Sequence, residues 1–273
     1  MSEALCTLDD LLACLAVEET SPSHFTGPNL ELPYSRIFGG QLLAQAIAIA
    51  TRAGSEKNVK SIHVTFPRPG DLREPIDYTV EPVHSGRSFA TEWIVGRQKH
   101  QAIFTALVSL HTPVDAEAFD HQLEAPAVGE PQHAPSLSLS MIPWETRIVG
   151  GIDLDSEELG PPRLELWQRA AKLPDGAAVH QALLAHSTDL TLIGTALRPH
   201  PGVSQAHSPE RIQTAVTTHT LWFHRPFRMD DWILLSQESP SVASQRGFGT
   251  GHAFAHSGEL VASFAQESMI RPA

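Results

Sequence analysis

The chain has 273 residues, of which 41% are hydrophobic and 18% are charged, so it is long enough to bury a large core and is not an intrinsically disordered protein. The formal net charge of −12 argues against a nucleic-acid binder, although a local basic cluster can still hold a small anion. The sequence has no apolar run of about 18 residues and no amino-terminal signal pattern, so we expect a cytoplasmic protein with no membrane span.

The first elements expected along the chain are two helices in different surroundings. Residues 7–19 are predicted to form a short amphipathic helix, with Thr7 as its N-cap and acidic residues in its first turn. After a turn-rich stretch, residues 39–54 form an alanine-rich run that opens with two glycines and is apolar almost all round. Such a helix is buried on every side, as happens when a sheet wraps around it.

Strand-like segments rich in β-branched and aromatic residues follow this helix. They lie at 60–66, 76–83, 88–97 and 102–110. Residues 112–140 are rich in proline and glycine and show no sustained period, which is typical of a linker. Strand patterns return from Trp144, a helical pattern covers 177–194, and the last strands are expected at 214–223, 231–239, 248–256 and 259–269.

The two halves of the chain resemble each other, which indicates an internal duplication. Three short motifs of the first half recur in the same order and at nearly the same spacing: Phe66-x-Arg68-Pro69 as Phe223-x-Arg225-Pro226, Ser88-Phe89-Ala90-Thr91 as Gly247-Phe248-Gly249-Thr250, and Ile103-x-Thr105 as Val261-x-Ser263. Chance similarity between amphipathic strands is the alternative. A duplication predicts two α+β units, each one apolar helix followed by a mostly antiparallel sheet, at 1–115 and 141–273 with a linker at 116–140.

Seven segments carry a resemblance to a known family. They are FGGQLLAQA, FPRPGD, GRSFAT, STDLTLIGTALRPH, LWFHRPF, ESPSVASQRGFGTGHAF and GELVASFAQESMIR. In this order they resemble the type II acyl-CoA thioesterases (TesB-like proteins) over nearly the whole chain, most weakly at 112–162. The resemblance implies a double hotdog, in which two antiparallel sheets each wrap around a long helix. It also implies hydrolysis of acyl-CoA to a free acid and coenzyme A, without a cofactor.

The resemblance further implies that an aspartate, a hydroxyl residue and a glutamine hold and activate a water. The aspartate maps to Asp189 and the glutamine to Gln266. The hydroxyl position, three residues before His219, is occupied by Val216, which cannot form a hydrogen bond through its side chain. On a regular strand Thr218 shares the face of Val216, so we expect Thr218 to compensate.

The side-chain chemistry of Asp189 and Gln266 fits these catalytic roles, and each residue also has a purely structural alternative. A positioned water, a base and donors for the oxyanion suffice to hydrolyse a thioester. Asp189 recurs at helical spacing with apolar residues, which places its carboxylate on an otherwise apolar helix face. The alternative is that Thr188 or Asp189 caps the start of a new helix at Leu190. An amide such as Gln266 can both donate to and accept from a water, whereas the commoner fate of a buried glutamine is satisfaction by neighbouring backbone.

The duplication predicts one working site per chain. Under it, Gln266 corresponds to Val108 and Asp189 corresponds to Ala48, so only the second half carries the polar pair.

Substrate-binding residues are expected at two places. Gly39, Gly40 and Gln41 could offer backbone N–H groups at a helix N-terminus to a carbonyl oxygen or a phosphate, although tight packing explains the glycines equally well. Arg246 is a candidate for the phosphates of coenzyme A, as are Arg68, Arg87 and Arg225; ordinary surface arginines are the alternative.

We expect no metal site and no nucleotide fingerprint. The fifteen histidines form no HExxH motif, and Cys6 and Cys14 are too few for a cysteine-rich zinc site. Two other functions stay open: an acyl-CoA or acyl-lipid binding protein that has lost turnover, which Val216 favours, and an enoyl-thioester hydratase, which would use His186 with Asp189. Exposed sheet edges predict a homo-oligomer. The preferred acyl chain length is not predicted.

Overall fold

The computed structural model describes residues 6–32, 34–53, 57–114 and 119–273. Its helices are α1 Leu8–Cys14, α2 Gly39–Ala53, α3 Ala177–Thr188 and α4 Leu192–Leu197, with short 3-10 turns at Pro131–His133, Val149–Gly151 and Gln205–His207. The strands of the first half are β1 Glu18–Ser21, β2 His24–Gly27, β3 Asn58–Thr65, β4 Ile76–Ser85, β5 Phe89–Gln98 and β6 Gln101–His111. Those of the second half are β7 Glu145–Ile148, β8 Arg163–Arg169, β9 Ile212–Phe223, β10 Ile233–Ala243, β11 Arg246–Ala255 and β12 Leu260–Pro272.

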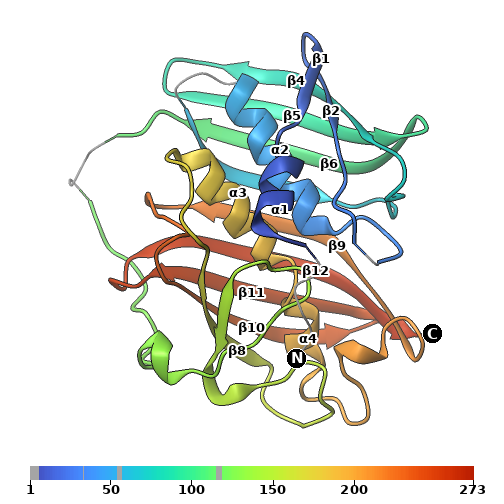
Figure 1. Cartoon of the computed structure of the whole chain (residues 1–273), viewed down its shortest axis with the longest axis vertical. Coiled ribbons are helices and arrows are strands. Elements are labelled where there is room, and N and C mark those ends of the chain that lie inside the picture. The colour runs from blue at the N-terminus through green and yellow to red at the C-terminus, as the bar shows by residue number, and fades with distance from the viewer. Residues whose placement is uncertain (1–5, 33, 54–56, 115–118) are drawn as a thin grey trace.

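The strands form one continuous sheet in which every pair of neighbours is antiparallel. Its order is β1-β2-β4-β5-β6-β3-β9-β12-β11-β10-β8-β7. The two halves join where β3 pairs with β9, and the order outward from this joint has the same pattern on both sides. Figure 1 shows the first half above and the second half below, with helices packed in front of both. This arrangement confirms the predicted α+β double hotdog; the two expected sheets are joined edge to edge.

The long helix of each half lies in the core, as its composition predicts. In α2 the residues from Gln41 to Ala50 are buried except Ala48, because apolar and small side chains occupy all sides of the helix. In α3 every residue from His180 to Thr188 is buried. The two helices pack against each other as well as against the sheet. The end of one hotdog helix therefore reaches the start of the other.

Two helices differ from the sequence prediction. The amphipathic helix at 7–19 is shorter, although Thr7 does cap it and forms a capping box with Asp10. The turn-rich stretch that follows contains the hairpin β1–β2. The pattern at 177–194 is interrupted after Thr188, whose hydroxyl bonds back to the carbonyl of Ala185, and the chain restarts as α4. Hydroxyl side chains that compete for backbone groups favour such breaks.

The segment that joins the halves runs along one side of the molecule (Figure 1). Gln122 anchors it to the turn between β11 and β12: its amide donates to the carbonyl of Gly258 at 2.8 Å and accepts from the N–H of Leu260 at 3.1 Å. Glu130 bonds to His256 at 2.8 Å in the same region. The segment between the predicted units is therefore tied to the second half.

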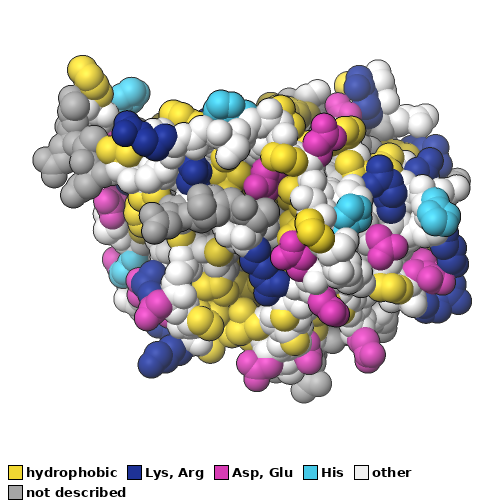
Figure 2. Space-filling view, turned by 90° about the horizontal axis from the view of Figure 1, so that it is seen from above, with side chains coloured by type: hydrophobic (Ala, Val, Ile, Leu, Met, Phe, Trp, Pro, Cys, Tyr) yellow, Lys and Arg dark blue, Asp and Glu magenta, His cyan; other side chains and the backbone are white. Residues whose placement is uncertain are grey.

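On the face seen in Figure 2, lysine and arginine side chains lie among aspartates and glutamates, with hydrophobic side chains between them. None of the helices in the described part of the chain is long and apolar enough to cross a membrane.

Candidate active site

Asp189 lies at the break between α3 and α4, where it is the C-cap of α3. Its backbone torsions remain helical (φ −79°, ψ −19°), and α4 begins only after Thr191, so Asp189 does not open a new helix at Leu190, which was the alternative interpretation. Its side chain is buried, and its Oδ2 accepts a hydrogen bond from the backbone N–H of Gly40 at 3.1 Å. Its Oδ1 is buried without a hydrogen-bond partner among the described residues. The carboxylate thus faces the N-terminus of α2 with one oxygen and leaves the other available.

Burial changes the acidity of this carboxyl. Removal from water raises the pKa of Asp189 from 3.8 to about 7, while the Gly40 N–H and the charge of Arg36 act in the opposite direction. A carboxylate with a pKa near neutrality is matched to proton abstraction at physiological pH. The hydrogen bond from the start of α2 also places the charge where a helix N-terminus favours an anion.

Gln266 lies on β12 with its side chain buried, and two neighbours fix its amide. Its Oε1 is 3.0 Å from Nδ1 of His219, the residue paired with it on β9. Its Nε2 donates to the hydroxyl of Ser268 at 2.9 Å. In the first half, the corresponding Val108 is buried and has no polar side-chain atom, which fits the prediction of one polar site per chain.

His219 links the aspartate to the glutamine. It is fully buried, and its Nδ1 lies 3.9 Å from Oδ1 of Asp189 as well as 3.0 Å from Oε1 of Gln266. Burial lowers the pKa of His219 from 6.5 to about 4, so the ring is neutral at pH 7. The structure therefore brings the two principal predicted residues to the same imidazole nitrogen. In the sequence, His219 served only to locate the hydroxyl position of the family. Its contact with Gln266 follows from their pairing across β9 and β12, which is known only once the strand register is known.

The expectation for Thr218 is wrong in its geometry. Gln266 pairs with His219, Glu267 with Thr218, and Ser268 with Val216, because β9 has a bulge at Thr217. Residues directly opposite each other share a face, so Val216 faces the same side as Ser268 and Gln266, and Thr218 faces the other side. The extra residue reversed the alternation on which the expectation depended.

The structure gives Gly39, Gly40 and Gln41 a role different from the predicted one. A Cβ on Gly39 would lie 2.7 Å from Oδ2 of Asp189, and one on Gly40 would lie 2.4 Å from the carbonyl oxygen of His186. The glycines therefore allow α2 to approach the end of α3. Gln41 is buried, and its amide bonds to Leu30, Asn29 and Pro28. These residues support Asp189 and the fold, and the Gly40 N–H is already used by the carboxylate.

A narrow pocket adjoins the polar cluster between α4 and strands β11 and β12; it has about 160 Å³ of empty space, none of it wide enough for a water molecule. Gln266 and Ser268 contribute to its wall, and Leu192, Ile193 and Ile270 give it an apolar side. Arg246 begins β11 one residue before Gly247, which also lines the pocket; its side chain is largely exposed and bonds to Glu267 at 3.3 Å. Of the predicted catalytic pair, Gln266 lines this pocket.

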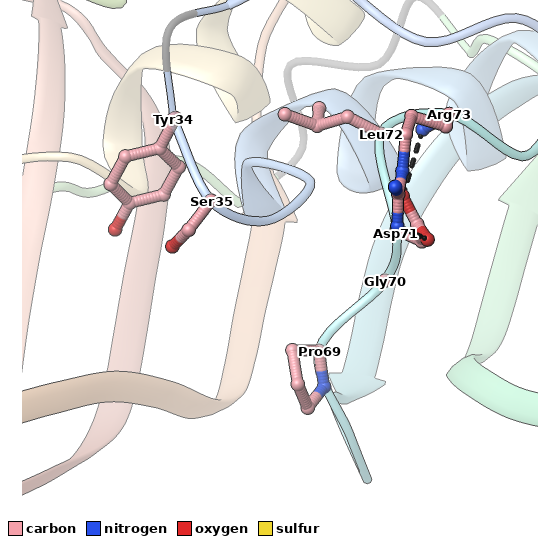
Figure 3. A pocket seen from close by; sticks show the side chains of 7 residues that line it. All are labelled: Tyr34, Ser35, Pro69, Gly70, Asp71, Leu72 and Arg73. Carbon is pink, nitrogen blue, oxygen red and sulfur yellow. Dashed lines mark hydrogen bonds and ion pairs between the residues drawn. The ribbon is translucent and has the colours of Figure 1, made fainter.

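A larger and more open pocket, with about 720 Å³ of empty space, lies at the loop before α2. It is lined by Tyr34, Ser35 and residues 69–73, and Figure 3 shows Arg73 turned onto Asp71. Hydrogen bonds from Arg73 hold the pKa of Asp71 below its ordinary value, and the arginine is exposed. The charged groups of this pocket thus neutralise each other, and the chemistry of the Asp189 cluster is the better candidate. The residues that the structure describes contain no cluster of three or more possible metal ligands.

Comparisons with known proteins agree with the geometry. Residues 158–269 match the family model described as acyl-CoA thioesterase, and residues 31–111 match the acyl-CoA thioesterase N-terminal domain. The chain is 29% identical to acyl-CoA thioesterase 2 of Haemophilus influenzae over 97% of this chain and 98% of the relative.

Two solved structures extend the similarity to the whole fold. The tesB protein of Mycobacterium avium subsp. paratuberculosis has a TM-score of 0.83 at 28% identity and covers 97% of this chain and 100% of its own. Acyl-CoA thioesterase II TesB2 of Mycobacterium marinum has a TM-score of 0.80 at 31% identity, with 96% and 97% coverage. The chain therefore belongs to the type II acyl-CoA thioesterase (TesB-like) family of thioester hydrolases.

Proposed function

We propose that the protein hydrolyses acyl-CoA to a free acid and coenzyme A through a water held by Asp189 and Gln266. One observation carries the proposal: a buried carboxylate has a free oxygen 3.9 Å from an imidazole that also bonds to Gln266. A buried carboxylate oxygen without a partner is costly for the fold and is typical of a site built for a reacting group.

In the proposed reaction the water donates one proton to Oδ1 of Asp189 and the other to Oε1 of Gln266. These two contacts direct the oxygen lone pair at the thioester carbonyl. Attack forms a C–O bond and places negative charge on the carbonyl oxygen. Collapse of this intermediate breaks the C–S bond, and the proton taken by Asp189 is returned to the departing thiolate. The neutral ring of His219 holds Gln266 in place.

The neighbouring pocket is apolar on one side, and it must widen to admit the acyl group of such a substrate. Leu192, Ile193 and Ile270 line the pocket wall beside Gln266, so an acyl group there would lie next to the reacting carbonyl. Arg246 is exposed and bonds to Glu267 on the sheet face opposite Gln266, and it is proposed to meet a phosphate of coenzyme A outside the pocket.

Thiol release from a panel of acyl-CoA chain lengths tests the proposal. We expect the wild type to release thiol, and Asp189→Asn to lower the rate at least about 100-fold. Asp231→Asn, at an exposed aspartate, is the matched control and is expected to leave the rate unchanged. Acyl-CoA binding without thiol release in the wild type would instead support the non-catalytic binding protein that Val216 favours. Loss of enoyl absorbance without free thiol would support a hydratase.

A further inference from the structure

A chain of buried hydrogen bonds continues beyond the predicted pair. The hydroxyl of Thr188 is 3.0 Å from Nε2 of His219, and Nδ1 of the same ring is 3.0 Å from Oε1 of Gln266. Nε2 of Gln266 then donates to Oγ of Ser268 at 2.9 Å. All four side chains are buried. The chain runs from the end of α3, across β9, to the inner face of β12.

The donors and acceptors available on each side chain determine which way the hydrogen bonds of this series point. Nδ1 of His219 faces two oxygen acceptors, Oε1 of Gln266 at 3.0 Å and Oδ1 of Asp189 at 3.9 Å. A neutral ring with its proton on Nδ1 accepts at Nε2 from Thr188, whose single hydroxyl proton then points at Nε2 and not at the carbonyl of Ala185, which is also 3.0 Å away. Gln266 accepts from the ring and donates to Ser268 in turn. An amide held from both ends keeps its oxygen directed at Nδ1 of His219.

Ser268 provides a hydroxyl group opposite Val216, whose side chain has none. It pairs directly with Val216 across β12 and β9, on the face shared with Gln266 and His219. It also lines the narrow pocket together with Gln266. Its oxygen accepts a hydrogen bond from Gln266, and its own O–H is able to donate toward the pocket.

On the basis of the proposed thioesterase function, we infer that Ser268 is a positioning residue that fixes the Gln266 amide for catalysis. It supplies, from the neighbouring strand, the hydroxyl that Val216 cannot provide. Directly opposed residues have Cβ atoms about 4.5–5.5 Å apart, so a hydroxyl on either strand lies close to the same amide. A purely structural serine would satisfy a buried amide without affecting turnover, and this difference can be measured.

The test combines the two cross-strand positions. In Ser268→Ala we expect kcat to fall about 10- to 100-fold while KM changes less than about threefold, because an orienting contact acts on the reacting geometry. Val216→Thr in the Ser268→Ala background is expected to restore kcat to within about threefold of the wild type, a coupling expected only for neighbours acting on one group. Ser263→Ala, on the other face of the same strand, is the matched control. Ser268→Thr and Ser268→Val, which differ only in the hydroxyl, repeat the comparison if the alanine variant does not fold.

The outcomes separate this inference from the proposed function. An unchanged kcat in Ser268→Ala, or a fall that Val216→Thr does not reverse, overturns the role of Ser268; the thioesterase proposal stands if Asp189→Asn is still inactive. Absence of thiol release by the wild type overturns both. Thermal unfolding of each variant shows whether a loss of kcat reflects a loss of fold.

Discussion

Replacement of Asp189 by asparagine should change how stability depends on pH. The carboxyl has a pKa of about 7 in the folded protein, against about 3.9 in an unfolded chain. Between these values the folded state holds a proton that the unfolded state has lost. This group therefore stabilises the wild type most fully below pH 4, and that contribution is lost as the pH rises through 7. Asparagine keeps an oxygen for the Gly40 N–H and has no titration.

The magnitude follows from the pKa difference. Each pH unit between the two pKa values changes the free energy of unfolding by about 1.4 kcal/mol, and the folded carboxyl is half ionised at pH 7, so from pH 5 to pH 7 the wild type should lose about 2 kcal/mol relative to Asp189→Asn. Urea unfolding of both proteins at pH 5, 6, 7 and 8 measures this difference, and any constant effect of the substitution cancels. A stability difference that is the same at all four pH values would refute the reasoning, because it would mean that Asp189 ionises like an exposed aspartate.

Three further substitutions test the geometry of the site. Gly39→Ala places a Cβ 2.7 Å from Oδ2 of Asp189, so we expect thiol release to fall at least tenfold as α2 and the carboxylate separate; a normal rate would show that their contact is dispensable. His219→Phe keeps a buried ring beside Phe264 but removes both nitrogens. Because Gln266 then loses its hydrogen-bond partner, kcat should fall at least tenfold, and an unchanged kcat in folded protein would show that His219 does not position Gln266. Thr218→Val should keep the wild-type rate within about twofold, because Thr218 faces away from Gln266; a loss of 100-fold would restore the original expectation for Thr218.

Composition was sufficient to predict the core of each half. The helix at 39–54 is apolar on all sides, and a helix of that kind has no stable place except inside a wrapped sheet. Its two opening glycines were visible as signals of close approach, but their partner was not, because Asp189 lies far away in the sequence. The contact between Gly40 and Asp189 exists only because the end of α3 meets the start of α2.

The error in the sequence prediction of the site comes from a single residue of β9. Strand alternation placed Thr218 beside Val216, and a single bulge at Thr217 reversed that assignment. A bulge depends on the partner strand, so the sequence of β9 alone does not reveal it. The same register determines that Ser268 is opposite Val216 and that His219 is opposite Gln266. These two residues were therefore outside the predicted site although they touch its members.

The pH dependence of kcat/KM for acyl-CoA hydrolysis tests most directly whether the ionised Asp189 is the base. The account predicts a rate that is constant above about pH 7 and falls tenfold per pH unit below it, since the protonated carboxyl cannot accept a proton from water. A kcat/KM that stays constant down to pH 5, in protein shown to be folded there, would contradict it.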